Sequence, residues 1–311
     1  MPNPDPATVL AAVAARRPDP SDGEAVSRWM MGVLSAFHSP AYRIDEVLAG
    51  LESLGLGPPD KTKMPTPHYV AQRSAPLGPV EAKAIASAFY GFSPAAIARS
   101  HAGIWAATTP QQVVDTVLAG VSKFYAPLFA TQSAAVGAAL DVLRAVADGQ
   151  ETAGRPLAAA WAGVGWTGDV FSDFWLATTH VRESRGDAHI ATLVAENIGP
   201  AECHFLARGD NANVRTNLMA FRGWTDDELG AAVARLEQRG ILDAAGKRTE
   251  EGVAIQARLE TATDRASADA WTACGASDVT ALADALMLLL EAVLVADVMP
   301  PPAYARLMPA S

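Results

Sequence analysis

The feature that most constrains this fold is a regular alternation between helix-forming segments and short stretches rich in Gly and Pro. Helix start signals recur along the chain, as at Ser93-Pro94 and Thr109-Pro110, where a capping side chain precedes a proline at the first helical position. Between them we find no convincing run of alternating apolar and polar residues of the kind that forms a sheet. The sequence therefore predicts a mainly α fold.

Breaker-rich stretches separate the predicted helices and suggest two domains. A Gly/Pro-rich linker near residues 149–156 divides the chain into domains of residues 1–150 and 151–311. Within the second domain, Arg185-Gly186-Asp187 is expected to end one helix, and Asp187 is expected to cap the next. The main helices are predicted over residues 7–17, 24–37, 43–54, 80–89, 94–103, 110–147 with a break at Pro127, 157–162, 169–184, 188–197, 200–208, 212–221, 226–239, 250–264 and 278–298.

The charge of the chain limits its partners. Its formal net charge of −10 argues against nucleic acid and against an anionic membrane surface. The most hydrophobic stretch, Ala281–Met299, contains Asp284 and Glu291 and is expected to be a buried helix. Without a signal-peptide pattern, and with only Cys203 and Cys274 outside any CxxC spacing, the chain is expected to be cytoplasmic.

One segment in the second half carries a recognisable pattern. Residues 225–252 begin with a capped helix that ends in the segment Leu236-Glu237-Gln238-Arg239-Gly240-Ile241-Leu242. A short hairpin follows, and Thr249-Glu250-Glu251-Gly252 then begins a long helix. This pattern resembles the winged helix of MarR-type proteins. The resemblance implies a winged-helix module over about residues 200–265, and so a helical N-terminal half joined to a MarR-like C-terminal half.

The whole chain also resembles a group of actinobacterial helical proteins with a MarR-like helix-turn-helix region. The segments that carry this likeness are Arg73–Gly78, Phe89–Pro94 and Arg182–His189. The resemblance implies a ligand-responsive transcription regulator as one alternative function. Charge opposes DNA binding by the module, because residues 222–265 contain seven basic and nine acidic residues, and the helix that would enter the groove begins Asp226-Asp227-Glu228.

The two halves echo each other in sequence. Phe89–Pro94 and Phe221–Asp226 share the order aromatic, any residue, Gly, aromatic and capping residue, followed by a predicted helix. Chance similarity between Ala- and Leu-rich helices is one explanation, and internal duplication is the other. A duplicated chain would form a pseudo-dimer, with a ligand site at the pseudo-twofold interface between its halves.

The densest polar run, Thr178–His189, lies between strongly apolar segments. Burying two Arg, two acids and two His is costly unless they are paired. The run is therefore either a functional site or a junction of caps and ion pairs. As a site, it supplies His189, Asp187 and Glu183 as catalytic candidates. The candidates for ligand binding are Arg185, Arg182, Arg73, His38 and Tyr42.

Motifs leave the cofactor open. HxxxH and HExxH spacings are missing, as are GxSxG, GxGxxG and P-loop patterns, so no nucleotide cofactor is predicted. His38, His189 and Glu183 are candidate metal ligands, and a metal- or haem-dependent enzyme stays as a third hypothesis. The leading hypothesis is a protein that binds a small-molecule ligand, as a monomer or homodimer, and that could be a biosynthetic enzyme of unknown reaction.

Overall fold

The computed structural model describes residues 4–59, 64–299 and 301–308, and it confirms the mainly α prediction. Within the described residues, the extended pairing is a single isolated antiparallel bridge between Leu242 and Arg248, at the predicted wing. The first half contains α1 (Pro6–Ala14), α2 (Gly23–His38), α3 (Asp45–Leu51), α4 (Pro67–Ser74), α5 (Ala82–Phe89), α6 (Pro94–His101), α7 (Ile104–Ala107), α8 (Pro110–Leu128) and α9 (Ser133–Asp148). Short turns of helix lie at η1 (Ser39–Tyr42), η2 (Glu52–Leu56) and η3 (Ala75–Leu77).

The second half is equally helical. It contains α10 (Pro156–Ala162), α11 (Val170–Ala195), α12 (Glu202–Arg208), α13 (Ala212–Arg222), α14 (Asp226–Gln238), α15 (Glu250–Ala266), α16 (Asp269–Cys274), α17 (Ala276–Val295) and α18 (Pro301–Leu307). Capping side chains start several helices as the sequence predicts. Thr109 and Thr225 both form capping boxes, with Gln112 and Glu228 respectively. None of the helices in the described part of the chain combines the length and apolarity that a bilayer crossing needs.

The predicted helix break at Arg185-Gly186-Asp187 is wrong, because α11 runs without interruption from Val170 to Ala195. Most of its residues from Ser172 to Ala188 are buried, and it packs against α2, α8, α9, α10 and α15. That burial outweighs the cost of about 1 kcal/mol for one glycine inside a helix. Asp187 therefore does not cap a second half of this helix; its carboxylate accepts hydrogen bonds from Leu157 N (2.8 Å) and Ala158 N (3.0 Å) at the start of α10.

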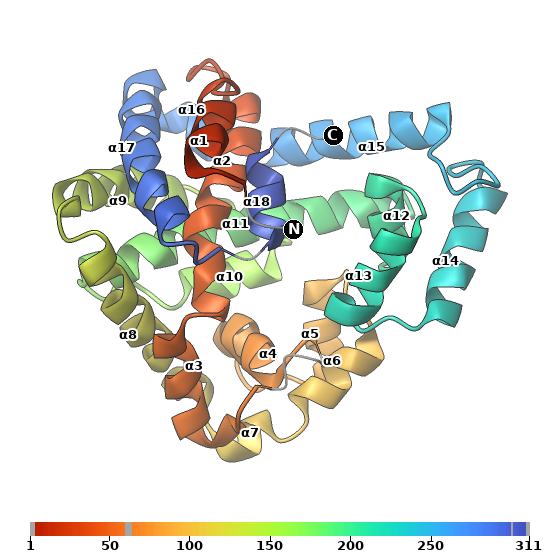
Figure 1. Cartoon of the computed structure of the whole chain (residues 1–311), viewed down its shortest axis with the longest axis horizontal. Coiled ribbons are helices and arrows are strands. Elements are labelled where there is room, and N and C mark those ends of the chain that lie inside the picture. The colour runs from red at the N-terminus through yellow and green to blue at the C-terminus, as the bar shows by residue number, and fades with distance from the viewer. Residues whose placement is uncertain (1–3, 60–63, 300, 309–311) are drawn as a thin grey trace.

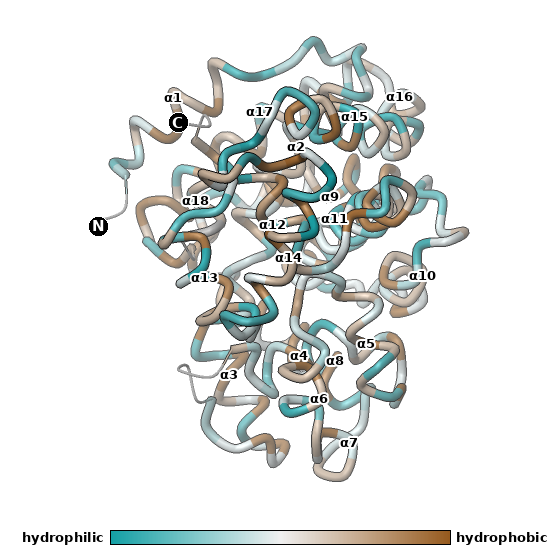
Figure 2. The backbone as a smooth tube through the Cα atoms, turned by 90° about the vertical axis from the view of Figure 1, so that its right-hand side faces the viewer, coloured by the Kyte–Doolittle hydropathy of each residue, from teal (hydrophilic) through white to brown (hydrophobic). Residues whose placement is uncertain are grey.

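Two separate hydrophobic cores organise the molecule. The larger core draws on helices from α1 to α18, on both sides of residue 150. The smaller core lies inside the predicted winged-helix module and includes Phe205, Leu229 and Leu259. In Figure 1, α11 crosses the middle of the molecule, and α14 forms the right-hand corner with the turn that follows it. Along most helices hydrophobic and hydrophilic residues alternate (Figure 2), as expected when one face is buried.

The two halves follow a parallel order of helices. The series α2, α4, α5, α6, α8 and α9 corresponds in order to α11, α12, α13, α14, α15 and α17. Helix α2 packs against its counterpart α11, and α9 packs against its counterpart α17. This arrangement is the one that a pseudo-twofold duplication requires, and duplication stays our interpretation of it.

Candidate functional site

Four arginines from four helices gather in one region that also contains Tyr69. Arg73 comes from α4, Arg182 from α11, Arg222 from the last turn of α13 and Arg306 from α18. Arg182 and Arg306 meet at the Ser35 hydroxyl, and the four positive charges lie close enough to shift one another's pKa. The Tyr69 hydroxyl has no hydrogen-bond partner among the described residues. We call these four side chains the arginine cluster.

Among the residues that the structure describes, one carboxylate, that of Glu183, lies within ion-pair distance of the arginine cluster. Arg73 binds it through one edge of the guanidinium: Nη2 donates to Oε2 at 2.8 Å, and Nε donates to Oε1 at 3.3 Å. Arg182 lies further away, with Nη1 3.9 Å from Oε1. Burial alone would raise the pKa of Glu183, but Arg73 and Arg182 hold it below the usual value. Glu183 is therefore an anion committed mainly to Arg73.

The other two arginines have no acidic partner among the residues that the structure describes. The Arg222 guanidinium lies over the ring of Phe92, 4.2 Å from its centroid, and burial lowers its pKa. Arg306 donates to the Ser35 hydroxyl from Nη1 at 3.0 Å. Burial, followed by the charges of Arg182 and Arg222, lowers the pKa of Arg306 to about 9. Four cations and one anion leave the cluster with a surplus of three positive charges.

Aromatic rings border the cluster. Arg73 lies over Phe89, 4.4 Å from the ring centroid, in the same manner as Arg222 over Phe92. The rings of Tyr69 and Tyr42 are 4.9 Å apart. The cluster thus combines guanidinium donors with aromatic side chains, and Arg73 and Arg222 each cover one aromatic face.

His38 and Tyr42 form a hydrogen-bonded pair beside the cluster. Thr179 Oγ1 donates to the carbonyl of Trp175 (2.9 Å), so it accepts from His38 Nδ1 at 2.9 Å. The neutral imidazole then accepts the Tyr42 hydroxyl at Nε2, 3.1 Å away. Burial, and then Arg182 and Arg73, lower the pKa of His38 well below its usual value. His38 is therefore a neutral group with both nitrogens engaged.

The predicted residues separate into two groups in the structure. Glu183, Arg182, Arg73, His38 and Tyr42 lie together at the arginine cluster. The other three predicted residues do not join them there. Asp187 caps α10, while Arg185 and His189 face α15 and bind Asp264 (2.5 Å) and Thr263 (3.1 Å) respectively.

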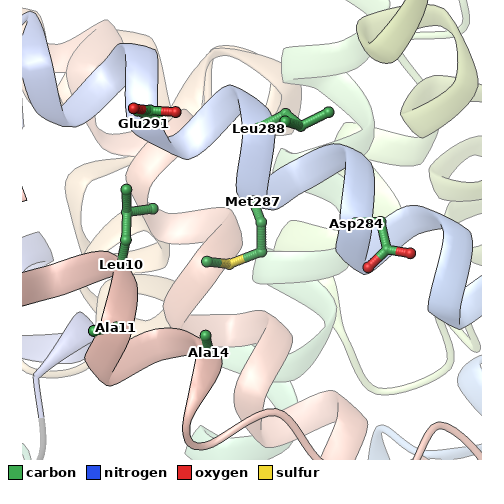
Figure 3. A pocket seen from close by; sticks show the side chains of 7 residues that line it. All are labelled: Leu10, Ala11, Ala14, Asp284, Met287, Leu288 and Glu291. Carbon is green, nitrogen blue, oxygen red and sulfur yellow. The ribbon is translucent and has the colours of Figure 1, made fainter. Parts of the chain in front are cut away.

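Metal ligands do not converge in the described part of the chain, where no three His, Cys, Asp or Glu side chains are placed to hold an ion together. His38, His189 and Glu183 are accordingly not brought into one ligand set. An open hollow of about 520 Å³ lies elsewhere, between α1 and α17, with Met287 facing Leu10 and Ala14 (Figure 3). Its polar edge consists of Asp284 and Glu291, so it does not suit an anion.

The turn that carries Arg222 sits on the corresponding turn of the first half. The backbone carbonyl of Arg222 accepts from Ser93 N at 3.0 Å, and Trp224 Nε1 donates to the carbonyl of Gly91 at 3.1 Å. Gly223 adopts a φ of +73° and lies against Ala96, where a side chain would collide. The two echoing sequence segments are thus in direct contact and fix Arg222 relative to α4 and α5.

Comparison with known proteins identifies the family. Residues 27–300 match the profile of a helix-turn-helix family, which includes most of the chain. The chain belongs to this helix-turn-helix family. Curated proteins and solved structures gave no match. In this helix-turn-helix protein, the matched region contains Arg73, Arg182 and Arg222 and ends before Arg306.

The sequence did not point to four residues at this site, namely Ser35, Tyr69, Arg222 and Arg306. Tyr69 and Arg222 had a weak signal, because one lies a turn before Arg73 and the other lies inside the repeated aromatic-x-Gly-aromatic segment. Ser35 and Arg306 of this helix-turn-helix protein have no local pattern that marks them as part of a site. Only the packing of α18 against α2 brings them together.

Proposed function

We propose that this protein binds a small organic anion at the arginine cluster. The observation that carries the proposal is the surplus of arginine: four guanidiniums share one region, and among the described residues Glu183 is the one carboxylate within ion-pair distance of them. Like charges brought together in a partly desolvated region repel strongly. A bound carboxylate or phosphate would remove this repulsion and satisfy the donors.

Access and donor supply also support a ligand at this place. Arg306 keeps a large solvent-accessible surface, although neighbouring protein groups lower its pKa to about 9. The unpartnered hydroxyl of Tyr69 could donate to the same anion as the arginines.

Binding is favoured over proton-transfer catalysis by the state of the acid and base groups. Glu183 is held by Arg73, and His38 uses both nitrogens on Thr179 and Tyr42. A general base needs a lone pair within reach of the substrate proton. The site offers donors and cations in abundance but no uncommitted base, so we place ligand binding ahead of a biosynthetic reaction.

The experiment is a titration of the purified protein with benzoate, phenyl phosphate and inorganic phosphate at low ionic strength, followed by calorimetry and thermal unfolding. At least one of these anions should bind and raise Tm. Arg222→Gln should weaken the binding of that anion by roughly tenfold or more. Arg99→Gln is the matched control, because it removes the same charge from an exposed position. Equal binding by Arg222→Gln and Arg99→Gln would contradict the proposal.

A second candidate is a ligand-responsive, MarR-like transcription regulator, and it is favoured by the family match and by the arrangement of α13, α14 and the Leu242–Arg248 bridge. Charge weighs against it, since the exposed first turn of α14 carries Asp226, Asp227 and Glu228. A gel-shift assay against the protein's own upstream DNA at low salt decides between the two. A specific shift that responds to the anion supports the regulator, and no shift removes it.

A further inference from the structure

Two arginines of the cluster share one neutral oxygen atom. Ser35 Oγ accepts from Arg182 Nε at 3.2 Å and from Arg306 Nη1 at 3.0 Å. The same hydroxyl donates its own proton to the carbonyl of Met31 at 2.6 Å, one turn earlier in α2. Ser35 is fully buried, so this oxygen holds both guanidiniums side by side without contributing any negative charge.

The end of the cluster near Ser35 lacks a counter-charge. Among the described residues, the carboxylate within ion-pair distance of Arg182 is that of Glu183 at 3.9 Å, and both oxygens of Glu183 already accept from Arg73. Arg306 has no carboxylate at ion-pair distance in the same part of the chain. Arg222 interacts electrostatically with Arg306 and likewise has none. Arg182 and Arg306 therefore meet at Ser35 from α11 and α18, and Arg222 of α13 adds a third positive charge to their surroundings.

The backbone around Arg306 is held firmly enough to preorganise its side chain. Arg16 donates to the carbonyl of Leu307, and its other terminal nitrogen donates to the carbonyl of Met308 at 3.4 Å. A Cβ at Gly32 of α2 would lie 3.1 Å from the Arg306 carbonyl oxygen, so α18 approaches α2 closely at this point. Preorganised donors lose less freedom on binding, which raises affinity.

We propose that Ser35, Arg182 and Arg306, together with Arg222, form a subsite for a phosphoryl group, so that the ligand is a phosphate-bearing small molecule. This rests on the proposed function, since it assigns a chemical class to the anion bound there. A phosphate monoester carries close to two negative charges and three terminal oxygens directed to different sides. Cations arriving from three helices match that geometry, whereas a planar carboxylate has two oxygens and one charge.

The test compares phenyl phosphate with benzoate, which share a ring and differ in the anionic group. Calorimetry is carried out on the full-length wild type, Ser35→Ala, Arg306→Gln and the charge-matched control Arg99→Gln, with unfolding curves to confirm that each variant is folded. In the wild type and in Arg99→Gln, phenyl phosphate should bind roughly tenfold more tightly than benzoate or better. Ser35→Ala and Arg306→Gln should lose most of that preference while they keep benzoate binding.

Inorganic phosphate separates the two sources of the phosphoryl group. Weaker binding of inorganic phosphate than of phenyl phosphate supports an organic phosphate, and equal binding supports the free ion at the same subsite. If benzoate binds as tightly as phenyl phosphate in the wild type, the phosphoryl assignment is wrong while anion binding stands. If no anion binds, the proposed function itself fails. Unchanged discrimination in both Ser35→Ala and Arg306→Gln would show that the phosphoryl group does not lie at this subsite.

Discussion

Two groups of charged side chains lie within one turn of each other on α11 and differ in their balance of charge. At the first group, the arginine cluster, Arg182 belongs to a set of four cations with one anion, Glu183. The second group joins α11 to α2 and α15. There, Arg185 pairs with Asp264 at 2.5 Å and with Glu260 at 3.4 Å, and Arg28 also pairs with Asp264.

This difference separates structural from functional use of buried charge. In the group around Asp264, two cations meet two anions, and the pairing offsets much of the cost of desolvation. In the arginine cluster the same kind of side chain is left without counter-charge, although the chain as a whole carries a net charge of −10. Such a local surplus in an acidic protein is the reason for our proposal that an anion is supplied from outside.

The largest expected effect comes from removing the carboxylate at the centre of the group around Asp264. Asp264→Asn leaves Arg185 and Arg28 without their shared carboxylate, which is completely buried. We expect the free energy of unfolding to fall by about 3–5 kcal/mol, measured by urea denaturation. Asp284→Asn is the control, because its pair with Arg17 is largely exposed at the aspartate and should cost less than about 1 kcal/mol. A small effect of Asp264→Asn would contradict a structural role for this group.

A smaller effect is expected from the one acid of the arginine cluster. Glu183→Gln leaves Arg73 unpaired and should lower the free energy of unfolding by roughly 2–3 kcal/mol. Because the lost charge can be replaced from outside, millimolar phosphate should restore a larger part of Tm in Glu183→Gln than in Asp264→Asn. Equal responses of the two variants to phosphate would remove the distinction between the groups.

A direct contrast between arginines sharpens the comparison further. Arg185→Gln loses a buried ion pair and should destabilise the protein by about 1–3 kcal/mol. Arg306→Gln removes a cation that is repelled by its neighbours, so the ligand-free protein should change by less than about 1 kcal/mol, in either direction. Paired denaturation curves measure both. A large loss in Arg306→Gln would mean that this arginine is structural.

A pH-dependent effect is expected at Asp187, which lies on α11 beside α10. Burial raises the pKa of Asp187 from the ordinary aspartate value of 3.8 to about 6, although the two amide donors of α10 act in the opposite direction. The folded protein therefore binds this proton more tightly than the unfolded chain does. Its contribution to stability is complete below about pH 4 and is lost as the pH rises through 6.

Asp187→Asn removes this titration and provides the measurement. The stability of the wild type relative to Asp187→Asn should fall by about 2 kcal/mol between pH 4 and pH 7. Thermal unfolding of both proteins across that range gives the difference, in which their other titrating groups cancel. A constant difference across the range would show that Asp187 keeps an ordinary pKa.

Much of the fold was predictable from local signals, because caps, prolines and helical spacing act within a few residues. The N-caps at Thr225 and Thr249 and the short bridge at Leu242–Arg248 follow directly from the sequence between 225 and 252. The break expected at Gly186 failed because tertiary burial of α11 outweighs one weak local signal.

The candidate site was only partly predictable for the same reason. Arg182 and Glu183 were noticed because their run is polar among apolar neighbours, but their surroundings depend on long-range packing. Arg306 lies more than 120 residues from Arg182 along the chain, and Arg222 lies at the end of a helix of the second core. Neither shows locally that it lies near other arginines.

The most direct test of anion binding at the arginine cluster is the position of an anomalously scattering oxyanion in crystals of the protein. Crystals soaked in selenate, a tetrahedral dianion, should show an anomalous peak between Arg182, Arg222 and Arg306, and Arg306→Gln crystals should lose most of it. A wild-type crystal with the four arginines gathered near Tyr69 and no peak among them, at selenate concentrations that label other surface sites, would contradict the account.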